Sequence, residues 1–278
     1  MKRRLLGIGF ALLLAGLAAA EVKPFAELYN DIAYYDTNVE RKGFASLLGR
    51  FEGKLGVTLI DTVQLYGAYY ATLSQAPNYW DNSLYYGPGL RCRPFNSFPK
   101  SNWQNEWVPD VKLFVESLSS TYFKDSVSGE ANKRTDLRAG FDLWHEWNLD
   151  NPDMNNYWGE LWSNLSYRST NFSWTEFNNY IFYFQPKVGR HLGRGIEAYL
   201  VGYAVVSGQN DYWLNNAAYG VGIRFEPWRA LMYENVLVRK FKMFAEALAV
   251  SYFKGRPADP LKDVSSDMRI GIDFSSGR

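Results

Sequence analysis

Residues 63–74 read VQLYGAYYATLS, and the two faces of this segment differ in character, with a period of two. One face carries Leu65 and Leu73, whereas the other carries Gln64 and Ser74. Period two is typical of a β-strand whose faces meet different surroundings. The segment has 12 residues, which is longer than an ordinary globular strand of about 5–6 residues and suits a tilted crossing of a bilayer. It therefore predicts a membrane-crossing strand.

The same alternation recurs along the chain. Near the C-terminus, Met268 and Ile270 alternate with Asp267 and Arg269. The expected fold class is all-β, a transmembrane antiparallel β-barrel of about 12 strands. The first strand is expected to pair with the last, because hydrocarbon offers no partner to an open sheet edge. A soluble β-sandwich or propeller remains the alternative, since it also uses alternating strands. The expected strands are 25–38, 45–58, 63–75, 83–94, 109–123, 133–147, 158–171, 178–191, 195–207, 215–227, 241–254 and 265–276.

The second half of the chain repeats the first. A shift of 133 residues lays Glu27–Phe95 on Glu160–Trp228 without a gap, with 22 identities in 69 positions. Shifts of 130 and 131 extend the match to the C-terminus. The pattern predicts two six-stranded repeats, about 25–147 and 158–276. The matched residues include Tyr66 with Tyr199, Tyr70 with Tyr203, Arg91 with Arg224, Glu116 with Glu246, Asp136 with Asp267, Arg138 with Arg269, and Asp142 with Asp273.

The N-terminus resembles an export signal. A basic start at residues 2–4 precedes an apolar run at 5–17 and three alanines at 18–20. This order predicts a secretory signal peptide over 1–20, cleaved after Ala20, which leaves 21–278 as the barrel. A single membrane anchor is the alternative, but the run is short for a spanning helix of about 20 residues. The expected location is the cell outer membrane.

Composition narrows the function classes. The net charge of +1 is too small to suggest a nucleic-acid partner, and the single cysteine, Cys92, cannot form an internal disulfide. Aromatic residues make up 17% of the chain, which suits the interfacial girdles of a membrane barrel. Seven tryptophans near expected strand ends are predicted to join these girdles: Trp80, Trp103, Trp107, Trp158, Trp162, Trp213 and Trp228.

Charged residues gather on the face opposite the apolar one, which would line the lumen. One hypothesis is a charged pore wall with aromatic patches that suits a passing polysaccharide. The other, which we favour for most of these charges, is a ladder of ion pairs that fills and stabilises the barrel, with partners on neighbouring strands. The candidate lumen charges are Arg91, Arg93, Glu116, Asp136, Arg138, Asp142, Arg224, Glu226, Glu246, Asp267, Arg269 and Asp273. The candidate lumen aromatics are Tyr66, Tyr70, Tyr199 and Tyr203. The same face also holds Glu27, Asp31, Arg50, Glu52, Lys54, Lys112, Glu160, Arg168, Lys187, Glu197 and Lys242.

Candidates for catalysis are few. The two histidines, His145 and His191, lie in no nucleophile-elbow context, and no cluster has metal-ligand spacing. We therefore expect no catalytic residues, no metal and no cofactor.

Two motifs suggest a family. The pattern Tyr-Gly-x-Gly-(Leu/Ile)-Arg-x-x-Pro occurs at Tyr86–Pro94 and Tyr219–Pro227, and Phe-x-Glu follows at Phe114–Glu116 and Phe244–Glu246. These modules resemble the C-terminal barrels of bacterial exopolysaccharide export porins and the related outer-membrane phage-adsorption receptors. The resemblance implies export of a secreted polysaccharide. Members usually carry a helical-repeat periplasmic region before the barrel. No such region is expected in this sequence, so for an export role the resemblance implies a separate periplasmic partner.

The leading functional prediction is a non-enzymatic outer-membrane channel that exports a polysaccharide. A plugged structural or surface-receptor barrel is the second hypothesis. An enzyme embedded in the barrel and acting on lipid or lipopolysaccharide is the third. Expected partners are outer-membrane lipid, lipopolysaccharide and the barrel assembly machinery, with no nucleic acid.

Overall fold

The computed structural model describes eleven ranges of the chain, and the strands lie in them. These ranges are 22–37, 45–60, 62–76, 81–97, 110–124, 134–147, 157–170, 177–210, 214–227, 241–254 and 264–276. The predicted signal peptide lies outside the described residues, as do Trp80, Trp103, Trp107, Trp213 and Trp228.

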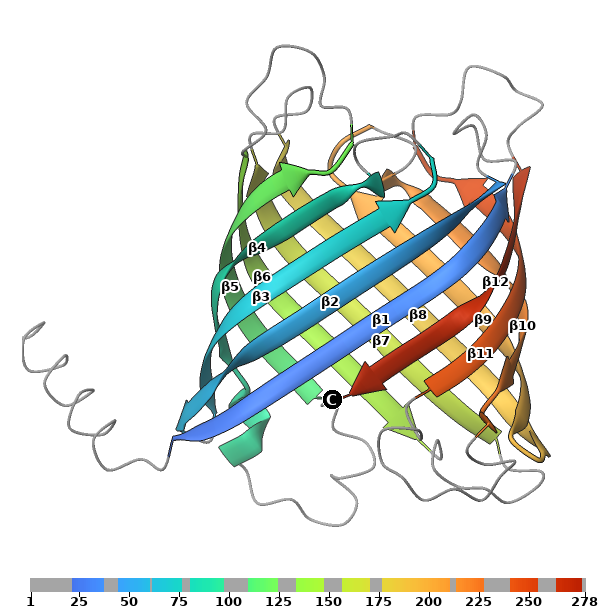
Figure 1. The fold of residues 1–278 in the computed structure, drawn as a ribbon, viewed down its shortest axis with the longest axis horizontal. Coiled ribbons are helices and arrows are strands. Elements are labelled where there is room, and N and C mark those ends of the chain that lie inside the picture. Colours follow the sequence, from blue (N-terminus) through green and yellow to red (C-terminus); the bar gives the residue numbers. More distant parts are fainter. Residues whose placement is uncertain are drawn as a thin grey trace, which may run out of the picture.

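Twelve antiparallel strands form one closed barrel (Figure 1). Each strand pairs with its neighbours in sequence, and β1 pairs with β12. The strands are β1 (Lys23–Thr37), β2 (Ala45–Ile60), β3 (Val63–Ser74), β4 (Ser83–Cys92), β5 (Asp110–Tyr122), β6 (Arg134–Trp147), β7 (Tyr157–Thr170), β8 (Phe177–Gly193), β9 (Ile196–Ser207), β10 (Asn216–Phe225), β11 (Phe241–Tyr252) and β12 (Val264–Ser276). A short 3-10 turn, η2 (Pro94–Ser97), follows β4. The all-β class, the strand number and the closure by β1 and β12 are confirmed, and every strand end lies within two residues of its predicted position.

One face of each strand carries the exposed apolar side chains. Leu65 on β3 is 48% exposed, Ile223 on β10 is 58% exposed and Ile270 on β12 is 62% exposed. Such a surface is unfavourable in water and favourable in hydrocarbon. The lipid-facing alternation predicted from the sequence therefore corresponds to the outer wall of the barrel.

Among the described residues, no helix is long and apolar enough to cross a membrane.

The opposite face of each strand points into the lumen. Arg91 on β4 bonds to Glu27 on β1, although β2 and β3 lie between them. Arg224 on β10 bonds to Glu160 on β7 in the same way. Bonds between strands that are not neighbours must cross the interior. The lumen is thus lined by the polar face and is bridged by side chains.

A buried asparagine braces the connection between β3 and β4. Asn82 accepts a hydrogen bond from the backbone N–H of Ser74 at 3.0 Å and donates one to the carbonyl of Ala76 at 2.9 Å. Asn215 makes the same two bonds between β9 and β10, at 3.0 and 2.7 Å. Asparagine side chains can replace backbone partners in turns, so these two residues hold matching strand connections closed.

Candidate functional site in the lumen

The first group of lumen charges is the Arg91 cluster, formed by Glu27, Gln64, Arg91 and Lys112. Arg91 donates through both terminal nitrogens to the two carboxylate oxygens of Glu27, at 2.7 and 2.5 Å, and through Nε to Gln64 at 2.5 Å. Lys112 approaches Glu27 at 3.7 Å. Arg91 is 2% exposed, so its guanidinium is shielded from solvent. The cluster as a whole joins four strands, β1, β3, β4 and β5.

The second group is the Arg224 cluster, formed by Glu160, Glu197, Arg224, Glu226 and Lys242. Arg224 donates to Glu160 at 2.6 Å and to Glu197 at 2.5 Å, and lies 3.9 Å from Glu226. Lys242 lies 3.5 Å from Glu160 and 3.7 Å from Glu226. Three carboxylates therefore share two permanent cations in a buried setting, where unpaired charge is costly.

The two clusters differ in charge at equivalent positions. Glu197 stands where the first half has Gln64, and Glu226 stands where it has Arg93. Nδ1 of His191 lies 2.6 Å from Glu197. Arg93 lies 3.1 Å from Asp110, which in turn lies 3.3 Å from Lys112, so both join the first cluster. The Arg224 cluster is therefore more acidic than the Arg91 cluster.

Two tryptophans expected in the interfacial girdles face the lumen instead. Trp158 is fully buried, and Arg224 lies 4.1 Å from the centre of its ring. Trp162 donates from Nε1 to Asp142 at 2.7 Å. The girdle prediction is wrong for both. Each sits on the lumen-facing side of β7, where the indole covers a buried charge or meets a carboxylate.

The Glu116 cluster joins two tyrosines and a lysine around one carboxylate. Tyr66 donates to Glu116 at 3.0 Å and Tyr70 donates to it at 2.7 Å, both across β4. Lys54 lies 3.5 Å from the same carboxylate, which is 1% exposed. The carboxylate is thus held by two hydroxyl donors and one cation.

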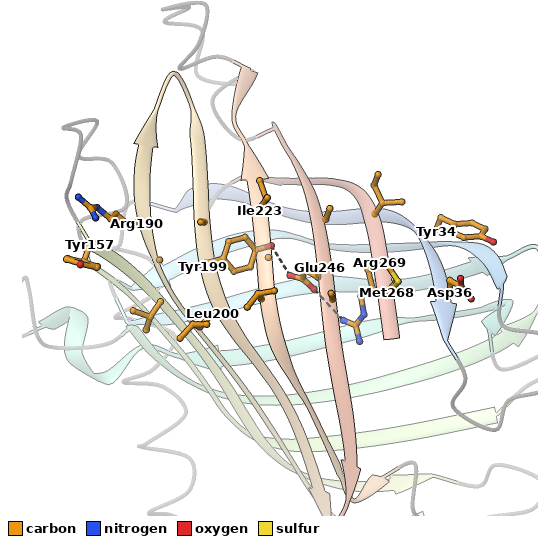
Figure 2. A pocket seen from close by; sticks show the side chains of 18 residues that line it. Tyr34, Asp36, Tyr157, Arg190, Tyr199, Leu200, Ile223, Glu246, Met268 and Arg269 are labelled. Atoms are coloured by element: carbon orange, nitrogen blue, oxygen red, sulfur yellow. Dashed lines mark hydrogen bonds and ion pairs between the residues drawn. The ribbon is translucent and has the colours of Figure 1, made fainter. Parts of the chain in front are cut away.

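The Glu246 cluster repeats this arrangement in the second half. Tyr199 and Tyr203 donate to Glu246 at 2.9 and 2.8 Å, and Lys187 lies 3.8 Å away. Arg269 adds a contact at 3.9 Å, and Figure 2 shows Tyr199, Glu246 and Arg269 in line. The predicted lumen aromatics therefore meet the predicted lumen charges in two matching groups.

The repeated Asp-x-Arg pattern pairs mainly within its own strand. Arg138 lies 2.7 Å from Asp136, and Arg269 lies 2.6 Å from Asp267, two residues away in each case. The expectation of partners on neighbouring strands is therefore wrong for these shortest contacts, because residues two apart share one face of a strand. Asp273 lies opposite Asp31 in the pairing of β12 with β1.

Part of the lumen face is exposed. The side chain of Arg50 on β2 is 48% exposed, although it points inward beside Asp31 at 3.8 Å. Glu52, two residues along the same face, is also exposed. Since the barrel is closed, this exposure lies inside the lumen, which therefore has room for water next to β2. Whether the lumen charges line a conducting pore stays a prediction.

A closed barrel with an apolar outer wall and a charged interior is the arrangement of an outer-membrane β-barrel. The chain is an outer-membrane β-barrel.

Some solved structures of known proteins are similar to this chain at low identity. The KdgM porin gives a TM-score of 0.39 with 10% identity, over 90% of this chain and 99% of that chain. The outer membrane channel DcaP of Acinetobacter baumannii gives 0.37 and 10%, over 93% and 98%. The outer membrane protein Omp33 of Acinetobacter baumannii gives 0.38 and 10%, over 91% and 98%. No family description and no curated protein matches the chain.

A cation–π pair recurs in the two halves with its partners exchanged. The guanidinium of Arg50 lies 5.5 Å from the ring centre of Tyr35, and that of Arg168 lies 5.3 Å from the ring centre of Tyr183. The shift of 133 residues puts Arg168 at the position of Tyr35 and Tyr183 at the position of Arg50. A count of identical residues between the halves does not reveal this pair, because the residue types differ at both equivalent positions. The exchanged contact supports the predicted repeat, which stays a prediction.

The two histidines contact an aromatic ring and a carboxylate, respectively. His145 stacks on Trp147 with ring centres 5.8 Å apart, and His191 contacts Glu197. The described residues contain no group of three His, Cys, Asp or Glu side chains able to hold a metal ion.

Proposed function

We propose that this barrel is a non-enzymatic channel of the outer membrane and that its cargo is a secreted polysaccharide. The exposure of Arg50 inside a closed barrel carries the channel part of the proposal, because a filled interior would bury that side chain. Barrels of about 8 strands are filled by side chains and those of about 16–18 leave an aqueous channel. Twelve strands lie between these limits, so the expected channel is narrow.

The tyrosine–carboxylate clusters support the cargo. Tyr66 and Tyr199 are 3% and 4% exposed, whereas Tyr70 and Tyr203 are half-buried and present part of each ring to the lumen. Aromatic rings offer apolar faces to sugar rings, and the adjoining charges offer hydrogen bonds to hydroxyls. We therefore assign polymer contact to Tyr70 and Tyr203 and a supporting function to the two buried tyrosines. A periplasmic partner that delivers the polymer belongs to the same proposal.

Current recordings with added sugar polymer test this assignment. Fragments of a secreted polysaccharide should reduce the single-channel current of the refolded protein, and Tyr203→Ala should weaken that block. The matched control is Tyr219→Ala, because Tyr219 is 52% exposed on the outer wall. An open channel whose current is insensitive to every polymer tried would refute the assignment of a polysaccharide cargo but not the assignment of a channel.

A plugged structural or surface-receptor barrel is the second candidate. It is favoured by the burial of Arg91 and Arg224 at 2% and of Glu116 at 1%, since the side chains around them bridge the lumen. On this hypothesis the clusters close the pore and no current flows under any condition.

A further inference from the structure

A groove of about 850 Å³ lies on the outer wall of the barrel (Figure 2). It runs from β8 across β9, β10, β11 and β12 to β1. Its sides are lipid-facing residues such as Leu200, which is 64% exposed, and Met268, which is 59% exposed. In the membrane, lipid is the solvent of this surface.

The strand pairing gives the direction of the groove. One row of directly paired residues follows its whole length: Arg190, Ala198, Ile223, Ala245, Ile270 and Tyr34. Five strand spacings of about 4.8 Å make this row about 24 Å long. Because strands tilt by about 45°, a row perpendicular to them rises about 17 Å along the barrel axis. Tyr34 lies three residues before β1 ends, near the rim opposite Arg190, so the whole row crosses both leaflets. Its first four spacings, from Arg190 to Ile270, rise about 14 Å. One leaflet of hydrocarbon is about 15 Å thick, half of a core of about 30 Å, so this part of the row matches one acyl chain.

The first half of the chain lacks the features that open this groove. Ala198 stands where the first half has Leu65, and Ala245 stands where it has Val115. Leu65 and Val115 are 48% and 50% exposed and project from the outer wall. The smaller alanine side chains at both positions leave a depression in the outer wall of the second half.

A cation stands at one end of the groove. Arg190 occupies the position of Val57 in the first half, and its guanidinium lies 5.7 Å from the ring centre of Tyr157. It faces the outer wall three residues before β8 ends at Gly193. An arginine on the lipid face costs less near the interface than at the midplane. Arginine also matches the geometry of phosphate oxygens. The depth of Arg190 near the membrane interface and its guanidinium group therefore both fit the phosphate of a lipid headgroup.

We propose that this groove binds one anionic phospholipid. Its phosphate accepts hydrogen bonds from Arg190, and one acyl chain lies over Ala198 and Ala245. The site is independent of whether the lumen conducts.

Lipid retention by the refolded full-length protein tests the proposal. Native mass spectrometry after exchange into detergent should show one dioleoyl phosphatidylglycerol bound to the wild type. Dioleoylglycerol, which has the same chains and no phosphate, should not be retained. Arg190→Val should weaken binding about tenfold, the factor that a lost charge-assisted hydrogen bond of about 1.4 kcal/mol gives. The double variant Ala198→Leu, Ala245→Val fills the groove and should abolish retention.

The matched control is Ala71→Leu, which adds the same bulk to an outward position on β3 away from the groove. Heat-modifiable migration shows that each variant is folded. Equal retention by all variants would overturn the proposal and mark the lipid as unspecific. Replacement of phosphatidylglycerol by lipopolysaccharide in the wild type would overturn the assignment to a phospholipid. A dimer that Ala198→Leu, Ala245→Val dissociates, with no bound lipid, would assign the groove to a second copy of the chain.

Discussion

Replacing Arg224 with alanine removes the main cation of the Arg224 cluster. Glu160 and Glu226 then share Lys242, whose ammonium lies 3.5 Å from Glu160 and 3.7 Å from Glu226, while Glu197 keeps its contact with His191 at 2.6 Å. Breaking a buried ion pair from one side costs about 3–5 kcal/mol. Because Arg224 is 2% exposed, we expect Arg224→Ala to lose about that much free energy of unfolding.

Arg91→Ala provides the comparison within the same chain. This substitution leaves Glu27 with Lys112 as a cation at 3.7 Å. The other hydrogen-bond partner of Arg91, Gln64, is neutral and leaves no charge behind. The loss is therefore closer to that of hydrogen bonds to a charged group, about 1.5–3 kcal/mol. The difference between the two variants measures the extra buried carboxylates of the second half.

A double variant tests the cause. Adding Glu197→Gln to Arg224→Ala removes a buried negative charge that has lost its arginine and restores the residue type of Gln64, so about 1–2 kcal/mol should return. Urea unfolding in detergent micelles, followed by circular dichroism, gives the free energies without relying on Trp158, which contacts Arg224. Equal losses in Arg91→Ala and Arg224→Ala, without rescue by Glu197→Gln, would refute the electrostatic reasoning.

Three further outcomes are expected. Arginine at Ile270, in the middle of β12, should cost roughly 2–4 kcal/mol near the bilayer midplane, and arginine at Leu65 or Ile223, each two residues from a strand end, should cost less; tolerance of all three in the same urea assay would show that the outer wall is assigned to the wrong face. Tyr199→Phe should cost about 1 kcal/mol, since it removes one hydrogen bond to Glu246, and an unchanged midpoint would mean that this bond contributes nothing. Unboiled and boiled samples should migrate differently on a gel, because the backbone bonds of a closed barrel are internal; identical migration together with solubility in the absence of detergent would contradict a membrane barrel.

Period two was enough to predict the strands, their number and their outward faces. Leu65 on β3 and Ile270 on β12 are far apart in the sequence, yet both point outward, because a closed sheet keeps the same face outside on every strand. Alternation says which face a side chain takes and nothing about how far the strands shear past one another. The bond from Arg91 to Glu27, 64 residues away, depends on that shear and was not predictable.

Other features needed the three-dimensional structure for a different reason. Trp158 lies at the start of β7, where sequence position alone favours a girdle, but its parity places it under Arg224. The outer groove arises from small residues at Ala198 and Ala245, which read as ordinary members of an apolar face. Comparison of the two repeats could have indicated the groove, because the positions equivalent to Ala198 and Ala245 carry the larger residues Leu65 and Val115.

We propose a water-filled path past Arg50 through a barrel that is otherwise bridged by ion pairs. Single-channel recording of the refolded protein in a salt gradient tests it most directly. We expect a small ohmic current, and Arg50→Glu should move the reversal potential towards cation selectivity, because Arg50 faces the path. Arg190→Val changes a charge of the same sign on the outer wall and should leave the reversal potential unchanged. No current from folded protein, or a reversal potential that ignores Arg50→Glu, would contradict the channel.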